Sequence, residues 1–74
     1  MAHTVAAELV GSVAKVLVRL GDTVTATDPV VILESIKMEI PVLAEVAGVV
    51  TVVGVEEGEV VSEGDTLAVI EPAS

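Results

Sequence analysis

The amino-acid sequence predicts an all-β fold of about seven or eight short strands, arranged as two similar halves. Apolar segments rich in valine and other β-branched residues recur along the chain, and pairs that combine an acidic residue with glycine or proline separate them. No segment combines the helical spacing of apolar residues with capping residues. Two interlocked sheets that close into a small flattened barrel, or sandwich, would leave few strand edges exposed, so we expect this architecture.

The two halves are recognised because the sequence matches itself at an offset of 37 residues. The identical pairs include Gly11 with Gly48, Val13 with Val50, Val16 with Val53, Val18 with Val55, Gly21 with Gly58, Val24 with Val61, Asp28 with Asp65 and Glu34 with Glu71. Similar residues match at further positions, namely Asp22 with Glu59, Thr25 with Ser62 and Leu33 with Ile70. Repetition of glycines and apolar residues at one offset indicates duplicated structure.

We therefore expect one domain, residues 1–74, whose halves at about 5–36 and 42–73 are related by a pseudo-two-fold axis. Because Lys37 coincides with Ser74 at this offset, Lys37 and the chain termini should lie at opposite ends of the molecule.

The main strands are expected at residues 4–10, 12–20, 30–33, 48–55 and 66–71. Turns between them are indicated at Gly21-Asp22, Asp28-Pro29, Glu57-Gly58 and Gly64-Asp65. In the second strand Lys15 and Arg19 alternate with apolar residues, which is typical of a strand with one exposed face. The run Val-Val-Ile-Leu at 30–33 is continuously apolar, which predicts a strand buried on both faces.

Two positions conflict with simple turn chemistry. Gly64 matches Thr27 at the repeat offset, so a turn that requires positive φ would strain Thr27. The repeat also requires a reversal near Ile36 and Lys37, although two-residue hairpins favour residues that tolerate positive φ. Because local rules are often broken at functional sites, we interpret the residues at this reversal as selected for recognition.

Composition restricts the classes of partner. The net charge is −9, and only Lys15, Arg19 and Lys37 could neutralise phosphates, which disfavours nucleic acid and anionic membrane surfaces. No apolar run approaches the length of a membrane span, and the start of the chain lacks the pattern of a signal peptide. The absence of cysteine fits a reducing compartment. A soluble, cytoplasmic protein is therefore expected.

Other candidate sites are weak. The acidic residues at 56, 57, 59, 63 and 65 lack the spacing of a calcium loop and indicate a solvated turn region. His3 has no cysteine or second histidine with which to bind zinc, and it lies too near the terminus for a Ser-His-Asp triad. No nucleophile–base pair, metal cluster or phosphate loop is visible, so the sequence disfavours an enzyme.

The most distinctive segment runs from Glu34 to Pro41 and reads Glu-Ser-Ile-Lys-Met-Glu-Ile-Pro, with Lys37 at the junction of the halves. It resembles the attachment motif of biotinyl domains, whose usual core is Glu-(Ala or Ser)-Met-Lys-Met. The flanking pattern is similar too, with a Gly-Asp turn sixteen residues before the lysine, an Ala-Gly pair ten residues after it and a closing Gly-Asp pair. The resemblance covers nearly the whole chain and is strongest to small free-standing biotin/lipoyl attachment proteins. It implies a flattened barrel of two four-stranded sheets.

The resemblance also implies a function. A biotin protein ligase would acylate Lys37 from biotinyl-adenylate on the attachment hairpin, residues 34–39. The chain would then carry CO2 between a biotin carboxylase and a carboxyltransferase, without catalysing either reaction. A lysine amine is largely protonated at neutral pH, so the ligase must supply both its deprotonation and the activated acyl group. The protein must supply a lysine held out on a rigid turn.

Two alternatives remain within this interpretation. A lipoyl carrier is less favoured, because lipoyl domains usually read Asp-Lys-Ala where this chain has Ile36 and Met38 around the lysine. A non-acylated interaction module would use the apolar tip as a docking surface.

Recognition contacts are expected from the residues that flank the lysine: Glu34, Ser35, Ile36, Met38 and Glu39. We expect Ile36, Met38 or both to be partly exposed beside the tip rather than in the core. Glu34 and Glu39 either contact the ligase or keep an apolar turn soluble. Ile36 departs from the family pattern, where methionine usually precedes the lysine, and its β-branched side chain is stiffer. We expect ligation to tolerate this change.

Overall fold

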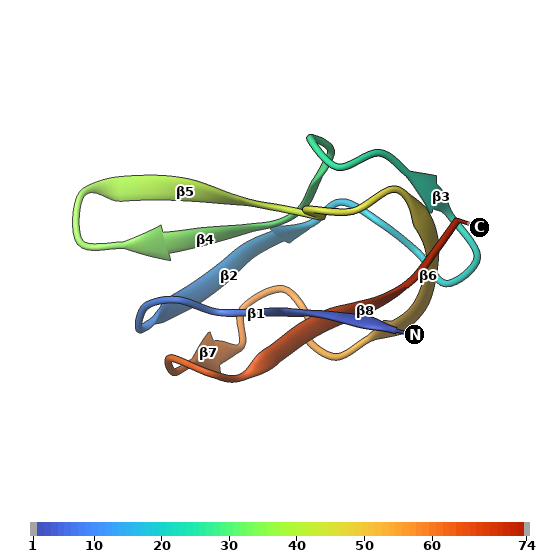
Figure 1. Ribbon diagram of the computed structural model, residues 1–74. Coiled ribbons are helices and arrows are strands. Elements are labelled where there is room, and N and C mark those ends of the chain that lie inside the picture. The colour runs from blue at the N-terminus through green and yellow to red at the C-terminus, as the bar shows by residue number, and fades with distance from the viewer. Residues whose placement is uncertain (1, 74) are drawn as a thin grey trace.

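Eight strands form two four-stranded antiparallel sheets in the computed structural model, which describes residues 2–73 (Figure 1). The strands are β1 (His3–Ala6), β2 (Gly11–Val16), β3 (Thr23–Val24), β4 (Pro29–Ser35), β5 (Met38–Leu43), β6 (Gly48–Val53), β7 (Val60–Val61) and β8 (Thr66–Pro72). One sheet has the strand order β1-β8-β6-β3, and the other has the order β5-β4-β2-β7. The predicted all-β class with two sheets is confirmed.

The repeat offset relates the two sheets strand by strand. A shift of 37 residues places β2 on β6, β3 on β7 and β4 on β8, while β1 falls on the second part of β5. The strand order of one sheet therefore becomes the strand order of the other. β4 and β8 even share the same sequence of buried and exposed positions. Three further identical pairs extend the repeat toward the N-terminus: Val5 with Val42, Ala7 with Ala44 and Glu8 with Glu45.

The core between the sheets consists of small aliphatic side chains. The largest fully buried ones are Leu33, Leu67 and Ile70, and valines fill most of the remaining space. β4 and β8 supply these three residues, because each is an interior strand with a neighbour on both sides. Val30 and Val31 are both buried next to a register shift between Pro29 and Val31, whereas Ile32 is only half-buried. The continuous burial predicted for 30–33 is therefore interrupted at one position.

Acidic side chains stabilise the four tight turns in matching pairs. Asp22 accepts a hydrogen bond from the backbone N–H of Arg19 at 2.9 Å, and its repeat mate Glu59 accepts one from Glu56 at 3.1 Å. The carboxylates of the other matching pair accept bonds from the backbone N–H groups three residues before them, at 2.9 and 2.8 Å: Asp28 from Thr25, and Asp65 from Ser62. Carboxylates that satisfy a backbone donor compete with strand pairing. The strand predicted at 12–20 ends at Val16, and at Arg19 a turn carboxylate takes the backbone donor that a longer strand would have used.

Several predicted strand boundaries were wrong. The strand predicted at 4–10 ends at Ala6, and the sequence analysis did not separate the two-residue strands β3 and β7. β5 continues through Pro41. Proline is tolerated there because β5 is the end strand of its sheet and pairs only with β4.

The strain expected at Thr27 is absent, because Thr27 is not among the residues with positive φ. Its repeat mate Gly64 has a φ of 93° and donates a backbone hydrogen bond to Ala7 at 2.8 Å. At the matching turn of the first half, Glu45 of the facing loop takes the left-handed conformation instead, with a φ of 72°, and donates to Ala26 at 2.9 Å. The two equivalent turns thus differ in where positive φ occurs. In one it lies in the turn itself, at Gly64, and in the other it lies in the facing loop, at Glu45.

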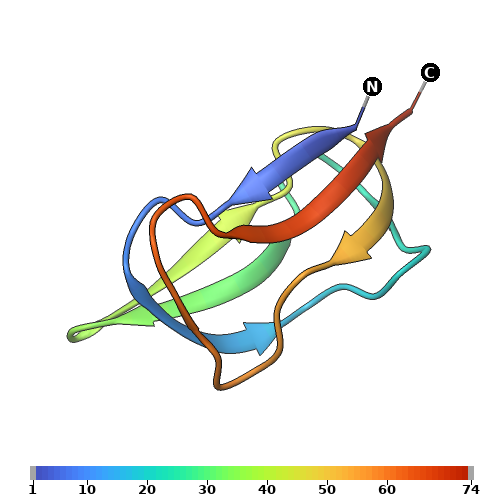
Figure 2. The same ribbon diagram turned by 90° about the horizontal axis from the view of Figure 1, so that it is seen from below.

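The hairpin of β4 and β5 projects from one end of an elongated molecule that measures 38 × 17 × 17 Å. The start of β1 and the end of β8 lie at the other end, as Figures 1 and 2 show. The predicted separation of Lys37 from the chain ends is confirmed for the strands that lead to them, while Ser74 itself lies outside the described residues. Residues 2–73 include no helix with the length and hydropathy needed to cross a bilayer.

Glycine at positions 11 and 48 permits close approach between strands, and the two sites should differ in sensitivity. A Cβ at Gly48 would overlap the carbonyl group of Glu71, whereas one at Gly11 would lie 2.8 Å from the carbonyl oxygen of Glu34. We expect Gly48→Ala to lower the free energy of unfolding by about 3 kcal/mol and Gly11→Ala by about 1 kcal/mol, since overpacking forces backbone shifts. Urea denaturation of the two variants checks this order. Equal losses would contradict the geometry.

The turn carboxylates generate a second prediction. Asp65→Ala removes the acceptor of the Ser62 backbone bond, so it should reduce the free energy of unfolding by about 1 kcal/mol. Glu63→Ala is the matched control, because Glu63 is exposed in the same turn and its side chain accepts no hydrogen bond from residues 2–73. Its effect should stay within about 0.5 kcal/mol. The measurement is thermal or urea unfolding, and a control variant as unstable as Asp65→Ala would refute the assignment.

Candidate functional site

The tip of the β4–β5 hairpin gathers all six site residues that the sequence predicts. Ser35 pairs with Met38 and Glu34 with Glu39, so Ile36 and Lys37 alone form the connecting loop. The reversal predicted near residues 36 and 37 is therefore confirmed. The tip extends beyond the buried core, since the last fully buried side chain of β4 is Leu33.

The backbone of the loop explains how an unfavourable residue pair makes a tight turn. Lys37 has a φ of 63°, whereas Ile36 is not among the residues with positive φ. Positive φ at the second loop position only is the φ pattern of a type II turn, not of the type I′ or II′ turns usual in two-residue hairpins. Left-handed backbone costs a non-glycine residue about 1 kcal/mol. The cost falls on Lys37, and the β-branched Ile36 avoids it.

The side chains at the tip are open to solvent. Ile36 is 87% exposed and Met38 is 59% exposed, so neither belongs to the core. Lys37 is also exposed, and within residues 2–73 no hydrogen bond or ion pair engages its ammonium group. The arrangement therefore presents one unpaired lysine between two apolar side chains on a short, fully paired hairpin.

Two carboxylates stand directly opposite each other behind the loop. Glu34 and Glu39 are cross-strand partners in register, and both are exposed. Like charges in this position repel and weaken a hairpin, so the pair opposes the stability of the tip. Together with Ser35, Lys37 and Met38 they line a shallow hollow of about 230 Å³. The tip thus presents an amine beside two negative charges.

The structure adds Val10 to the site, which the sequence analysis missed. Val10 is 64% exposed and lines a second hollow of about 460 Å³ together with Gly11, Glu34, Ser35 and Ile36. The β1–β2 loop therefore lies against the base of the hairpin. The signal in the sequence was Gly11, because its lack of a side chain lets β2 begin against the carbonyl group of Glu34. The repeat revealed the glycine but not the neighbour that it brings to the tip.

Within the acidic region at 56–65, two residues stabilise turns through backbone hydrogen bonds. Glu59 and Asp65 accept backbone hydrogen bonds, as described above. Over the described part of the chain, no three side chains of His, Cys, Asp or Glu converge as metal ligands. His3 instead contacts a single carboxylate, since its Nε2 lies 3.0 Å from Oε1 of Glu45.

Comparisons with known proteins agree with this geometry. The chain is 54% identical over 70 residues to the biotinylated protein TB7.3 homolog of Mycobacterium leprae, an alignment that covers 95% of this chain and 99% of that one. It is 44% identical to a biotin carboxyl carrier protein of Streptococcus mutans, over 93% of this chain and 53% of that protein. The crystal structure of the Kluyveromyces lactis urea carboxylase contains a similar fold, with a TM-score of 0.90 and 35% identity over 96% of this chain and 6% of the enzyme.

A family model described as "Biotin-requiring enzyme" matches residues 2–70, which is nearly the whole chain. The two four-stranded sheets and the exposed lysine at the tip of the β4–β5 hairpin agree with this match. The chain therefore belongs to the biotin/lipoyl family.

Proposed function

We propose that this protein is a biotin carboxyl carrier and that Lys37 is its attachment residue. The observation that carries the proposal is the position of Lys37, exposed and unpaired on a two-residue loop at the end of the molecule opposite the start of β1 and the end of β8. In this position an enzyme can enclose the lysine without a steric clash with the barrel. The carrier names of the relatives from M. leprae and S. mutans support the choice of biotin.

The residues of the hairpin fit a covalently attached group. The amine of Lys37 is held by no partner among residues 2–73, so acylation breaks no contact of the fold. A protonated amine is not a nucleophile, so the ligase must remove the proton before acyl transfer. Biotin, when bound, supplies a carrier of CO2 between a biotin carboxylase and a carboxyltransferase. The fixed hairpin sets the point about which the attached arm moves.

The partners follow from the same proposal. A biotin protein ligase modifies the chain, and the carboxylase and carboxyltransferase of a biotin-dependent carboxylase use it. The likeness to a domain of urea carboxylase supports partners of this class. Ile36 and Met38 offer them apolar contact area on either side of Lys37, and Val10 adds to it from the neighbouring loop. Ser35, Glu34 and Glu39 supply polar contacts. We place the protein in the cytoplasm, as its composition suggests.

The first experiment is the intact mass of the full chain after incubation with a biotin protein ligase, ATP and biotin, followed by peptide mapping. We expect a gain of one biotinyl group on Lys37. Lys37→Arg keeps the charge and the fold and should abolish the modification. An unchanged mass, beside a control biotin domain that is labelled, would favour lipoylation, which the same assay tests with a lipoate ligase and lipoate.

Lys15→Arg is the matched control for this experiment. Lys15 is the only other lysine, and it lies on β2 within a paired sheet rather than on a loop. Lys15→Arg should be labelled like the parent chain. Labelling that persists in Lys37→Arg and disappears in Lys15→Arg would overturn the site assignment. Failure of both biotinylation and lipoylation would leave the tip as a docking surface.

The opposed carboxylates give a prediction with two readouts. The double variant Glu34→Gln and Glu39→Gln removes the repulsion across the hairpin, so it should raise the midpoint of thermal unfolding by a few degrees. If the ligase recognises these charges, the same variant should be labelled at least several-fold more slowly in a time course. Glu56→Gln with Glu63→Gln, which removes the same number of charges outside the tip hollows, is the control for net charge. Unchanged labelling of the double variant would show that the carboxylates serve solubility alone.

A further inference from the structure

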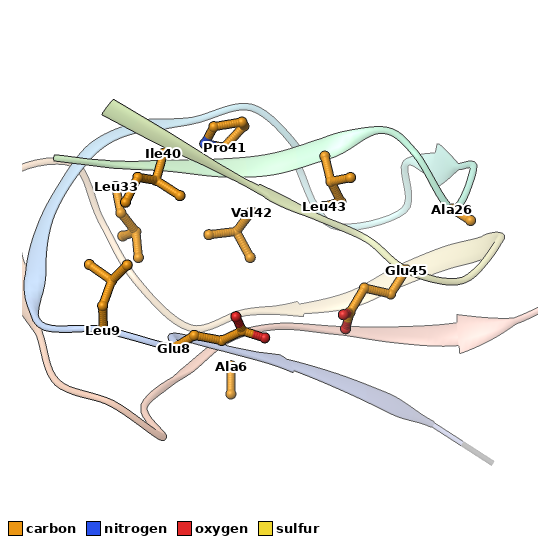
Figure 3. A pocket seen from close by; sticks show the side chains of 10 residues that line it. All are labelled: Ala6, Glu8, Leu9, Ala26, Leu33, Ile40, Pro41, Val42, Leu43 and Glu45. Carbon is orange, nitrogen blue, oxygen red and sulfur yellow. The ribbon is translucent and has the colours of Figure 1, made fainter. Parts of the chain in front are cut away.

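A cavity separate from the two tip hollows lies along the side of the barrel, where the end strands of the two sheets approach each other. β1 ends one sheet and β5 ends the other. Between them is an apolar cavity of about 280 Å³, with Leu33 at its base. The side chain of Leu9 enters it from one side, and those of Ile40 and Val42 enter it from the other (Figure 3). The cavity is large enough for one long side chain.

The rim of the cavity carries two carboxylates that the internal repeat relates to each other. Glu8 follows β1 and Glu45 follows β5, and both line the cavity. Figure 3 shows the two carboxylates directed toward one another along one side of the opening. Glu45 is held by its contact with His3 of β1, at 3.0 Å, so that its oxygen bridges the loop after β5 and the opposite strand.

Among residues 2–73, no Lys or Arg side chain lies at the two carboxylates, and His3 contacts only Glu45. The three Lys and Arg residues, Lys15, Arg19 and Lys37, are all absent from the lining of the cavity. Two negative charges beside an apolar cavity favour a ligand with an aliphatic stem and a cationic head. The net charge of −9 draws such a ligand toward the protein from a distance.

A strand that added to the free edge of β5 could not form every backbone hydrogen bond there. In a two-residue hairpin the residues that flank the loop exchange hydrogen bonds, so the N–H groups of Met38 and Ile40 face β4 and position 41 faces the free edge. Pro41 has no N–H at that position and also lines the cavity. A partner strand therefore finds a missing donor where it would add to β5, and a side chain inserted into the cavity is the better way to bind.

We propose that this cavity binds an arginine side chain from a segment of a partner protein. The three-carbon stem packs against Leu9, Ile40 and Val42, and the guanidinium group donates hydrogen bonds to Glu8 and Glu45 together. Arginine is favoured over lysine because its planar group carries five donors and serves two carboxylates at once. None of residues 34–39 lines the cavity, so the site is separate from the tip. The inference goes beyond the proposed carrier function and does not rest on it.

The test is a titration of the isotope-labelled full chain, carrying Lys37→Arg, with the tripeptide acetyl-leucyl-arginyl-leucinamide, followed by backbone amide resonances. We expect a dissociation constant on the order of 1 mM, which is typical of one inserted side chain, with the largest shifts at Glu8, Leu9, Leu43 and Glu45. The same peptide with lysine in the centre should bind several-fold more weakly. Equal binding of the two peptides would overturn the assignment to arginine.

The matched variants separate this site from general attraction between opposite charges. Glu8→Gln with Glu45→Gln keeps an acceptor for His3 and removes two charges, and it should weaken peptide binding at least tenfold. Glu56→Gln with Glu63→Gln removes the same number of charges from exposed turns elsewhere and should leave binding unchanged. Equal weakening by both pairs, shifts spread over the acidic turns, or shifts confined to residues 34–39 would each refute the proposal. Shifts that appear on concentrating the protein without peptide would assign the cavity to a second copy of the chain.

Discussion

Neither half of this chain can complete a sheet by itself, because the two halves exchange strands. β1 pairs with β8, β3 with β6 and β7 with β2, so each sheet contains strands from both halves. The leucine and isoleucine side chains of β4 and β8 are covered only when both sheets are in place. The hairpin that carries Lys37 depends on this exchange, since β4 is held between β2 and β5. Most of the pairings join distant parts of the sequence, a topology that folds more slowly than one with local contacts.

The internal repeat made the architecture predictable while the boundaries were not. Glycines at matching positions and a shared apolar rhythm indicated two related sheets, and the structure maps one onto the other strand by strand. Strands in the valine-rich segments were predicted too long. Strand propensity takes no account of a carboxylate such as Asp22, which accepts a backbone hydrogen bond and so favours a turn over further strand pairing. Thr27 shows a further limit. The repeat indicated which position was at risk of strain, but the loop relieved it by placing positive φ on Glu45, which no local pattern indicates.

The candidate site was predicted more completely than the fold around it, for a physical reason. All six residues of the tip are consecutive in the sequence, so one hairpin brings them together without tertiary contacts. Val10 could not be found this way, because its place beside the hairpin depends on packing between β2 and β4. The pair of Glu8 and Glu45 was hidden for the same reason. Each residue looks like an ordinary surface charge until the two end strands bring them to one opening.

The exposure of Met38 has a chemical consequence of its own. A thioether that is 59% exposed at the tip is accessible to peroxide as well as to a partner enzyme. Oxidation to the sulfoxide replaces an apolar, flexible contact with a polar one beside Lys37. The barrel would keep its stability, because Met38 contributes nothing to the buried core. Oxidative damage at this position would therefore alter how the tip is recognised while leaving the fold intact, and methionine sulfoxide reductases would reverse it.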